Sequence, residues 1–516
     1  MDFENTLLNF KDLKQRLQYA VTLPEKLMLD LCAKNTELNQ TVCLNDEYWK
    51  LRYLTQREAP KTEPKSWKEL YLFPDTDGNV WSFGNNEDGQ LGLGDSDIDT
   101  ERIIPTQIPG IKAKQIACGS AYSMIIDIYD NVWSFGNNED GQLGLGDSGE
   151  ETDINTPTQI PNIKAKQIAC GYYHSMIIDM NDNVWSFGDN DNGQLGLGDS
   201  GEETNRTKPA QIPGIKAKQI ACGYYHSMII DINDNVWSFG NNGSVLFKNN
   251  GGGQLGLGDN TNRNTPTQIP NIKATQISCG DDFSMIIDTN SNVWSFGHNY
   301  YGQLGLGDNG VNTDRNKPTQ IPDIKAKQIA CGRDHAMIID TDNNVMSFGF
   351  NYRGQLGLGD NGENVEENMD RNKPTQIQDI KAKQIACGDT HSMIIDTNNQ
   401  VWSFGNNEYG QLGTYDNDDI NIPTQIHIPS GINSKQIACG DMHSIILTNI
   451  QTLSPFDEIT NMFSQGQIVK FEIEHNLQIQ YKALEGIYIG TFTDKQGQKK
   501  YGYIRYNSQT NQILKP

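Results

Sequence analysis

The sequence predicts an all-β protein, a seven-bladed β-propeller with a small N-terminal helical segment and a small C-terminal β segment. Three landmarks, each present seven times, lead to this prediction. Val-Trp-Ser-Phe-Gly begins at residues 80, 132, 184, 236, 293 and 401, and a variant with Met346 in place of Trp begins at residue 345. Gly-Gln-Leu-Gly follows each copy, and a Cys-Gly pair comes after it. Tandem repeats of about 50 residues are typical of propellers, in which each repeat supplies one blade.

Each repeat is predicted to form four short strands. Lys-Gln-Ile-Ala-Cys-Gly is the first, and its small residues suit the crowded centre where blades converge. Ser-Met-Ile-Ile-Asp is the second and is apolar on both faces, as a strand covered on both sides must be. Asn-Val-Trp-Ser-Phe-Gly is the third. Pro-Thr-Gln-Ile is the fourth and belongs at the outer edge, where the proline's missing N–H does no harm.

The loop before that proline varies in length, from residues 260–265 in the fourth copy to residues 361–373 in the sixth, which predicts a surface loop on one side of the disc. The repeats begin near a third strand at 79–84 and end after a second strand at 444–447. The last blade must therefore combine strands from both ends of the repeat region, which removes free sheet edges. Residues 72–75 also align with a second strand, so the sequence leaves open which segment closes the ring.

Composition narrows the functional classes. The net charge of -24 and the pI near 4.7 argue against nucleic acid as a general partner, because an acidic surface repels phosphates. Seven of the nine cysteines recur once per repeat and cannot all pair with one another, which favours a reduced protein. The N-terminus is acidic, and no apolar stretch approaches the roughly 18 residues of a membrane span. We therefore expect a cytoplasmic or nuclear protein that does not enter a membrane.

The repeats resemble the regulator of chromosome condensation repeat family over about residues 70–448. The resemblance rests on the run from Cys170 to Ser175 (Cys-Gly-Tyr-Tyr-His-Ser) and on the run from Trp185 to Gly198, which includes Gly-Gln-Leu-Gly-Leu-Gly. It implies a seven-bladed propeller. The family's founding member is a nucleotide exchange factor for a small nuclear GTPase and is anchored on chromatin, whereas most relatives use the propeller for protein contacts.

The fourth repeat contains an insertion at residues 242–252, eight residues longer than the matching segment of its siblings. The founding member of the family has a wedge loop at the corresponding point, although in its third such repeat and with a different sequence, and its basic tail has no counterpart here. The insertion holds three apolar residues that are predicted to be exposed. The candidate partner-binding residues are Ser244, Val245, Leu246, Phe247 and Lys248.

Residues 1–54 are predicted to be helical, because leucines recur at helical spacing and Thr22 to Glu25 fits a capping box. This segment resembles an F-box, the family that docks a Skp-type adaptor and joins a cullin ubiquitin ligase. The alternative is a helical cap that packs its leucines on the propeller. The residues of the candidate adaptor-binding face are Leu23, Pro24, Leu27, Leu31, Leu38, Val42 and Trp49.

The remaining segments are less informative. Residues 55–69 contain two prolines and several charges, which suits a linker. Residues 449–516 are predicted to form a small β-rich segment, with strands at 468–473, 477–481, 486–492 and 500–506.

The histidines and cysteines that recur in the repeats are predicted to have structural roles and not to form metal or catalytic sites. Five histidines stand four residues after a repeat cysteine, a pair of zinc-ligand types, but Tyr122 and Phe283 occupy the equivalent positions and cannot bind zinc. The repeated cysteines occur too often for nucleophiles and are expected to fill the inner strands. The turn at 189–193 resembles a calcium loop but lacks its full spacing. We predict no catalytic residues, no metal and no cofactor.

The sequence thus predicts a non-catalytic protein–protein interaction scaffold. Through its F-box-like segment it would be a substrate receptor of a cullin-type ubiquitin ligase, with a Skp-type adaptor as one partner. The alternative is a guanine nucleotide exchange factor for a small GTPase, in which the insertion would distort the nucleotide site.

Overall fold

The computed structural model describes residues 78–97, 99–243, 252–360, 369–426, 428 and 432–450, and the backbone of four strands between residues 478 and 514. The chain divides into two compact units. Gly78–Asn449 is one, and Met1–Asp77 with Ile450–Pro516 is the other. Apart from the short 3₁₀ turns η2 (Glu150–Thr152) and η3 (Glu202–Thr204), the regular structure of the described residues is β-strand, which confirms the predicted fold class. The F-box-like face and the predicted linker lie outside the described residues.

The third repeat shows how one blade is built. The end of β6 (Ile154–Cys170) pairs antiparallel with β7 (His174–Asp179), which pairs with β8 (Asn183–Gly188), which pairs with the start of β9 (Arg206–Cys222). The end of β9 then begins the next blade beside β10 (His226–Asp231). Each long strand therefore serves as the outer strand of one blade and the inner strand of the next.

The other blades follow the same order and are numbered by their copy of Val-Trp-Ser-Phe-Gly. Among the described residues the pairings form seven four-stranded sheets, consistent with the predicted seven blades. Blade 2 begins with β3 (Ala113–Cys118), and blade 7 ends with β21 (Ile420–Gln425). The remaining long strands are β12 (Arg263–Cys279), β15 (Arg315–Cys331) and β18 (Arg371–Cys387). The remaining second strands are β4 (Tyr122–Asp127), β13 (Phe283–Asp288), β16 (His335–Asp340) and β19 (His391–Asp396). The remaining third strands are β5 (Asn131–Gly136), β11 (Asn235–Gly240), β14 (Asn292–Gly297), β17 (Asn344–Gly349) and β20 (Val401–Gly405).

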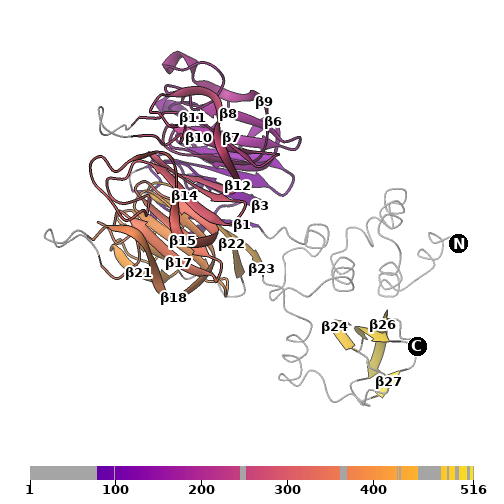
Figure 1. Cartoon of the computed structure of the whole chain (residues 1–516). Helices are drawn as coiled ribbons and strands as arrows, with labels where there is room; N and C mark the ends of the chain where they lie inside the picture. The colour runs from indigo at the N-terminus through magenta and orange to yellow at the C-terminus, as the bar shows by residue number, and fades with distance from the viewer. Residues whose placement is uncertain are drawn as a thin grey trace. The chain divides into compact units, whose positions relative to one another are not determined.

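Blade 1 closes the ring with strands from both ends of the repeat region (Figure 1). Its order is β22 (Ile432–Cys439), β23 (His443–Ile450), β1 (Asn79–Gly84) and β2 (Arg102–Gln107). Val80 lies opposite Leu447, and the indole Nε1 of Trp81 donates to Thr448 Oγ1 at 3.0 Å. The second strand of this blade is therefore β23, as the predicted interlock requires. The competing segment at residues 72–75 lies outside the described residues.

The core lies between neighbouring blades. One cluster joins Tyr122 and Met124 of blade 2 to Ile168, Ile177 and Phe187 of blade 3. The flanking residues of the same second strand point the other way, so that Met176 and Ile178 pack against blade 4. Because each second strand is covered on both sides, it is apolar at successive positions, as predicted.

The C-terminal strands form a separate antiparallel sheet in chain order. It consists of β24 (Gln478–Leu484), β25 (Ile487–Thr493), β26 (Lys499–Asn507) and β27 (Gln512–Leu514). Three of these strands overlap the predicted strands at 477–481, 486–492 and 500–506. Where the structure describes the chain, it contains no helix of the length and hydropathy needed to cross a membrane.

Candidate partner-binding face

Two kinds of loop meet on one face of the ring. Because the second strand of each blade runs back across the disc, the first and third strands end on the same side. The turn after the first strand contacts the long loop after the third strand. In blade 3 the backbone N–H of Asp189 donates to the carbonyl of Tyr173 at 2.9 Å, and in blade 4 that of Asn241 donates to the carbonyl of Tyr225 at 2.8 Å. We call this side the long-loop face.

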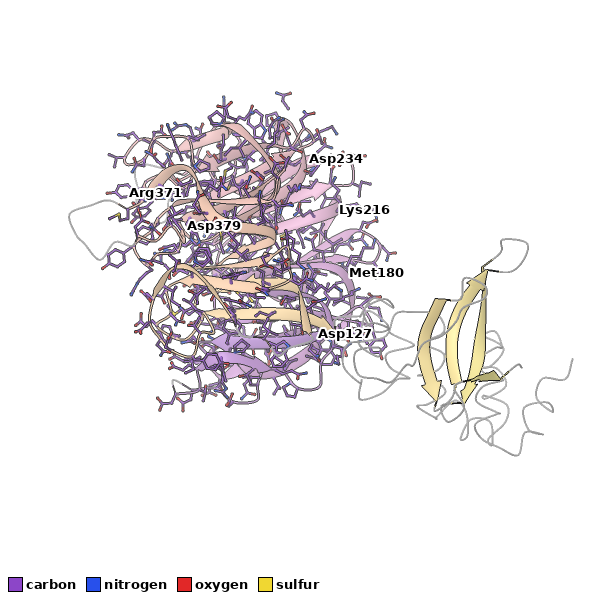
Figure 2. The ribbon with its side chains drawn as sticks, turned by 90° about the horizontal axis from the view of Figure 1, so that it is seen from below. Asp127, Met180, Lys216, Asp234, Arg371 and Asp379 are labelled. Atoms are coloured by element: carbon purple, nitrogen blue, oxygen red, sulfur yellow. The ribbon has the colours of Figure 1, made fainter. Side chains whose placement is uncertain are left out.

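The opposite side holds the tight turns between second and third strands, and we call it the turn face. Figure 2 shows Met180, Lys216 and Asp234 along this side of the ring and Arg371 on the other. The turn face is built alike in successive blades. In blade 4 the carboxylate of Asp231 accepts hydrogen bonds from the backbone of Asn233 and Asn235, and from the Asn235 amide and Trp237 indole. Burial alone would raise the pKa of Asp231, but these donors outweigh it and lower that pKa below its usual value.

The central channel opens on the turn face into a cavity of about 890 Å³ lined by lysines and glutamines. Its lysines are matched by carboxylates of the neighbouring turns. The Nζ of Lys166 lies 2.6 Å from Asp182, and Lys114 and Lys218 pair in the same way with Asp130 and Asp234. The charges of these pairs are thus neutralised within blades 2, 3 and 4, whereas Lys327 and Lys383 of blades 6 and 7 contact asparagine side chains.

The long loops share one hydrogen-bonded skeleton, shown by blade 3. The side-chain amide of Asn190 donates to the carbonyl of Asp199 at 3.1 Å and accepts from the backbone N–H of Leu195 at 3.1 Å. Gly193 turns the chain at a φ of 83°, where a Cβ would lie 2.6 Å from the Cα of Asn264 in the next blade. The Gly-Gln-Leu-Gly motif therefore exists because only glycine fits this contact between blades.

The insertion of blade 4 leaves this skeleton intact. Asn242 donates to the carbonyl of Asp259 at 2.8 Å and accepts from Leu255 at 3.0 Å, although both partners are displaced along the chain. Gly243 and Gly252 form an antiparallel bridge, so the insertion leaves and rejoins the blade at one point. The predicted binding residues Ser244, Val245, Leu246, Phe247 and Lys248 lie outside the described residues. Their point of attachment is on the long-loop face.

The channel opens on the long-loop face into a second cavity, of about 160 Å³, lined by the seven Cys-Gly pairs and the residue after each pair. This placement confirms that the first strand is innermost. We call the following seven residues the mouth ring, and they differ from blade to blade although the flanking residues repeat. In the order of blades 1 to 7 they are Asp441, Ser120, Tyr172, Tyr224, Asp281, Arg333 and Asp389.

One half of the mouth ring is charged. The guanidinium of Arg333 lies 3.8 Å from Asp281 and 3.5 Å from Asp389, and it also lies 3.6 Å from Asp334. Across the ring, the hydroxyl of Ser120 donates to Asp441 at 2.6 Å. Burial, together with repulsion from Asp389, raises the pKa of Asp441 to about 7. Burial and repulsion from Asp334 also raise the pKa of Asp281 well above its usual value.

The other half of the mouth ring is aromatic. The rings of Tyr172 and Tyr224 are stacked with centroids 3.9 Å apart. Each also makes an edge contact with the tyrosine that follows it in the sequence, Tyr173 at 4.4 Å and Tyr225 at 4.3 Å. Four tyrosines from blades 3 and 4 thus form one cluster on the long-loop face.

A second aromatic cluster lies on the long loops of blades 5 and 6. Tyr301 lies 4.7 Å from Phe350, and Tyr300 and Tyr352 are 39% and 53% exposed. Phe350 stands at a position where other blades have a side chain that accepts a hydrogen bond from the repeated glutamine. In blade 2, Gln142 donates to Asn137 at 2.6 Å, whereas the buried Nε2 of Gln355 in blade 6 has no hydrogen-bond partner among the described residues. An orphaned donor of this kind costs about 1–3 kcal/mol.

The repeated histidines join neighbouring blades. The Nε2 of His174 lies 2.8 Å from the hydroxyl of Ser227 in the next blade, and the four other histidines of the set repeat this contact. Burial and repulsion from His226 lower the pKa of His174 to about 3, so the ring is neutral. Phe283, which cannot form the bond, faces a blade in which Ala336 replaces the serine.

The cysteines of the repeats are free thiols, and burial raises the pKa of Cys170 well above its usual value. Such thiols are poor nucleophiles because the thiolate is disfavoured. Within the described ranges no group of three histidine, cysteine or acidic side chains is arranged to hold a metal ion.

The mouth ring and the aromatic cluster of blades 5 and 6 are not among the sites predicted from the sequence. The signal was present in the sequence, because these residues stand where the repeats differ. The residue after each Cys-Gly pair changes in four of six steps around the ring from blade 2 to blade 1, while Ile-Ala-Cys-Gly before it is nearly constant. Comparison of the copies by position would have found both features.

Comparisons with known proteins agree with this architecture. The family model described as RCC1-like domain matches residues 70–381 and 273–456. The ultraviolet-B receptor UVR8 of Arabidopsis thaliana is 32% identical over 359 residues, which cover 67% of this chain and 76% of UVR8. The RCC2 homologue of Xenopus laevis is 28% identical over 378 residues, which cover 67% of this chain and 70% of that protein.

A similar solved structure is that of Prp20p from Saccharomyces cerevisiae. It superimposes with a TM-score of 0.63 at 21% identity, over 82% of this chain and 99% of that one. At this identity the likeness concerns the fold. Together with the repeat landmarks, the interlocked blade and the matched family model, it leads to one conclusion: this chain belongs to the RCC1-like domain family of β-propellers.

Proposed function

We propose that this chain is a non-catalytic protein-interaction scaffold and that its long-loop face binds the partner protein. One observation supports this above the others. On that face, the positions where near-identical repeats differ hold tyrosine, phenylalanine, arginine and aspartate. Tyrosine and arginine are enriched at the centres of protein interfaces.

The cost of these residues supports the same proposal. Phe350 deprives Gln355 of its acceptor, and Asp281 and Asp441 hold carboxyl groups in an unfavourable setting. Residues that lower the stability of a fold and yet occupy one surface are characteristic of functional sites.

Capture of partners from the protein's own cells tests the proposal with a matched control. The face variant is Tyr300→Ser with Tyr352→Ser, and the control is Tyr129→Ser with Ile232→Ser on the turn face, whose side chains are 52% and 55% exposed. We expect the face variant to lose specifically co-purifying proteins by at least about tenfold and the control to keep them. Equal capture by both variants would reject the long-loop face as the docking surface.

The N-terminal segment extends this proposal to a ubiquitin ligase. Its F-box-like pattern supports capture of a Skp-type adaptor, with the propeller holding the target. Substitution of Leu31 and Trp49 by alanine is expected to abolish capture of the adaptor by the full chain. Failure of the intact chain to capture any Skp-type adaptor would remove the ligase role and leave the scaffold proposal standing.

The second candidate function is exchange of guanine nucleotide on a small GTPase. The insertion supports it, because its base at Gly243 and Gly252 lies on the long-loop face, and the similar protein Prp20p has binding properties to Gsp1p and histones. A nucleotide-release assay on a panel of small GTPases decides the question. Faster release that is lost when residues 244–251 are deleted supports exchange activity, and unchanged release for every GTPase rejects it.

A further inference from the structure

The mouth ring combines features that suit one kind of ligand. A stacked pair of tyrosines, Tyr172 and Tyr224, forms one wall of the cavity, and carboxylates stand on both sides of that wall, Asp441 beyond Ser120 and Asp281 next to Tyr224. We propose that this mouth binds the cationic head of a lysine or arginine side chain that projects from the partner protein. The inference rests on the proposed function of the long-loop face and names the chemistry that its centre recognises.

The charge balance of the mouth favours a cation. Three carboxylates of the mouth ring, those of Asp281, Asp389 and Asp441, and the neighbouring carboxylate of Asp334 surround a single guanidinium, that of Arg333. Asp334 also lies 3.8 Å from the Nδ1 of His298. Arg333 lies within 4 Å of three of them, whereas Asp441 is held by hydroxyl donors from Ser120 and Tyr172. An added ammonium or guanidinium would balance this excess, and an anionic ligand would increase the repulsion.

The tyrosine pair adds an attraction that carboxylates alone lack. A cation over a tyrosine ring is attracted by the electron-rich face of the ring, and more strongly when water is excluded. The cavity of about 160 Å³ holds roughly five water molecules at about 30 Å³ each. It therefore admits the head of one side chain and is too small for a folded element.

The two ends of the channel differ in their charged groups. On the turn face the lysines of blades 2, 3 and 4 pair with aspartates, such as Lys166 with Asp182. Lys327 and Lys383 of blades 6 and 7 contact asparagines instead, so these groups leave no excess of carboxylates at that end of the channel. On the long-loop face the charges do not match, and they come from positions where the repeats have diverged. The raised pKa values of Asp281 and Asp441 show that the free protein holds these carboxylates at a cost, which a bound cation would relieve.

Peptide titration of the full chain tests the proposal. The probes are acetylated, amidated pentapeptides with arginine or lysine between paired glycines, and the neutral twin has glutamine in that position. Binding is measured by saturation-transfer NMR on the peptide. The mouth variant is Asp281→Asn with Asp441→Asn, and the matched control is Glu87→Gln with Glu139→Gln, two exposed carboxylates on the same face.

We expect both cationic peptides to bind and the glutamine peptide to bind at least about tenfold more weakly. The mouth variant should lose about tenfold in affinity, and Tyr172→Leu should lose several-fold, while the control changes less than about twofold. Equal affinity of the mouth variant and the unmodified chain would overturn the proposal, as would equal binding of the glutamine peptide. A cooperative thermal melting transition at or above the temperature of the unmodified chain confirms that the variants are folded.

The two proposals can fail separately. If the Tyr300/Tyr352 variant loses its partners while the mouth variant keeps them and binds peptides normally, the cation site is wrong and the docking face stands. If the mouth variant loses the peptides but no variant of the face changes partner capture, the cation site stands and the docking face is wrong.

Discussion

The two faces of the ring are made from the same seven repeats, yet their aspartates behave in opposite ways. On the turn face, Asp231 accepts four hydrogen bonds, and its pKa lies below its usual value. On the long-loop face, Asp441 shares a crowded mouth with other carboxylates, and its pKa rises to about 7. One carboxylate stabilises the fold, and the other destabilises it.

This difference shows that a repeated sequence contains two kinds of position. A residue that every copy needs in order to close its own turn stays the same in successive blades, as do Asp127, Asp179, Asp231 and Asp288. A residue that faces the common centre can differ from blade to blade, because side chains from all seven copies together form one asymmetric surface. Residues that repeat in successive blades therefore maintain the fold, and residues that differ between blades form the surface that distinguishes this protein.

The largest expected effect comes from removing a turn-face aspartate. Asp231→Ala removes the acceptor of four hydrogen bonds and should lower the free energy of unfolding by about 2–3 kcal/mol at neutral pH. Because folding lowers the pKa of Asp231, its stabilisation is present above the usual value of 3.8 and is lost as pH falls through the folded pKa. Denaturant unfolding at several pH values measures this, with Asp342→Ala, an exposed turn aspartate, as the control.

The next effect has the opposite sign and comes from the mouth. Asp441→Asn should raise the free energy of unfolding by about 1–2 kcal/mol at about pH 8, less than a full conversion of the pKa shift because Asp441 is only partly buried. Since folding raises this pKa from 3.8 to about 7, the penalty grows as pH rises between those values and vanishes near 3.8. A variant less stable than the unmodified chain at high pH would refute the sign.

A smaller effect tests the aromatic cluster. Phe350→Asn restores the acceptor that Asn137 provides for Gln142, so Gln355 regains a partner and the free energy of unfolding should rise by about 1 kcal/mol. The same change removes an aromatic ring from the long-loop face and should weaken partner capture several-fold. Thermal unfolding and quantitative capture on one preparation measure both. Improved stability without loss of capture would separate the cluster from binding.

The smallest effect concerns the hydrogen bonds between neighbouring blades. Phe283 and Ala336 replace the histidine and serine that join the other blades. Phe283→His combined with Ala336→Ser should recreate the bond that His226 forms with Ser284 at 2.9 Å. A double-mutant cycle is expected to give a coupling of about 1 kcal/mol in favour of the pair. Purely additive effects would mean that the histidine contact contributes no stability.

The fold was predictable because each landmark has a local physical cause. Gly193 has to be glycine beside Asn264, and Ile177 has to be apolar between two covered faces, so both recur with the period of the blade. The inner position of the cysteine strand followed from residue size. The candidate site was not predictable in the same way, because the mouth ring depends on side chains brought together from seven copies. Arg333 and Asp389 lie 56 residues apart, and the packing of neighbouring blades places them within 3.5 Å.

Hydrogen–deuterium exchange of the full chain, with and without a captured partner, tests the central claim most directly. If the diverged positions form the binding surface, the partner should slow exchange in peptides over residues 172–174, 224–226 and 298–302, and leave the turns at 127–131 and 179–183 unchanged. Protection confined to those turns would contradict the assignment of function to the long-loop face.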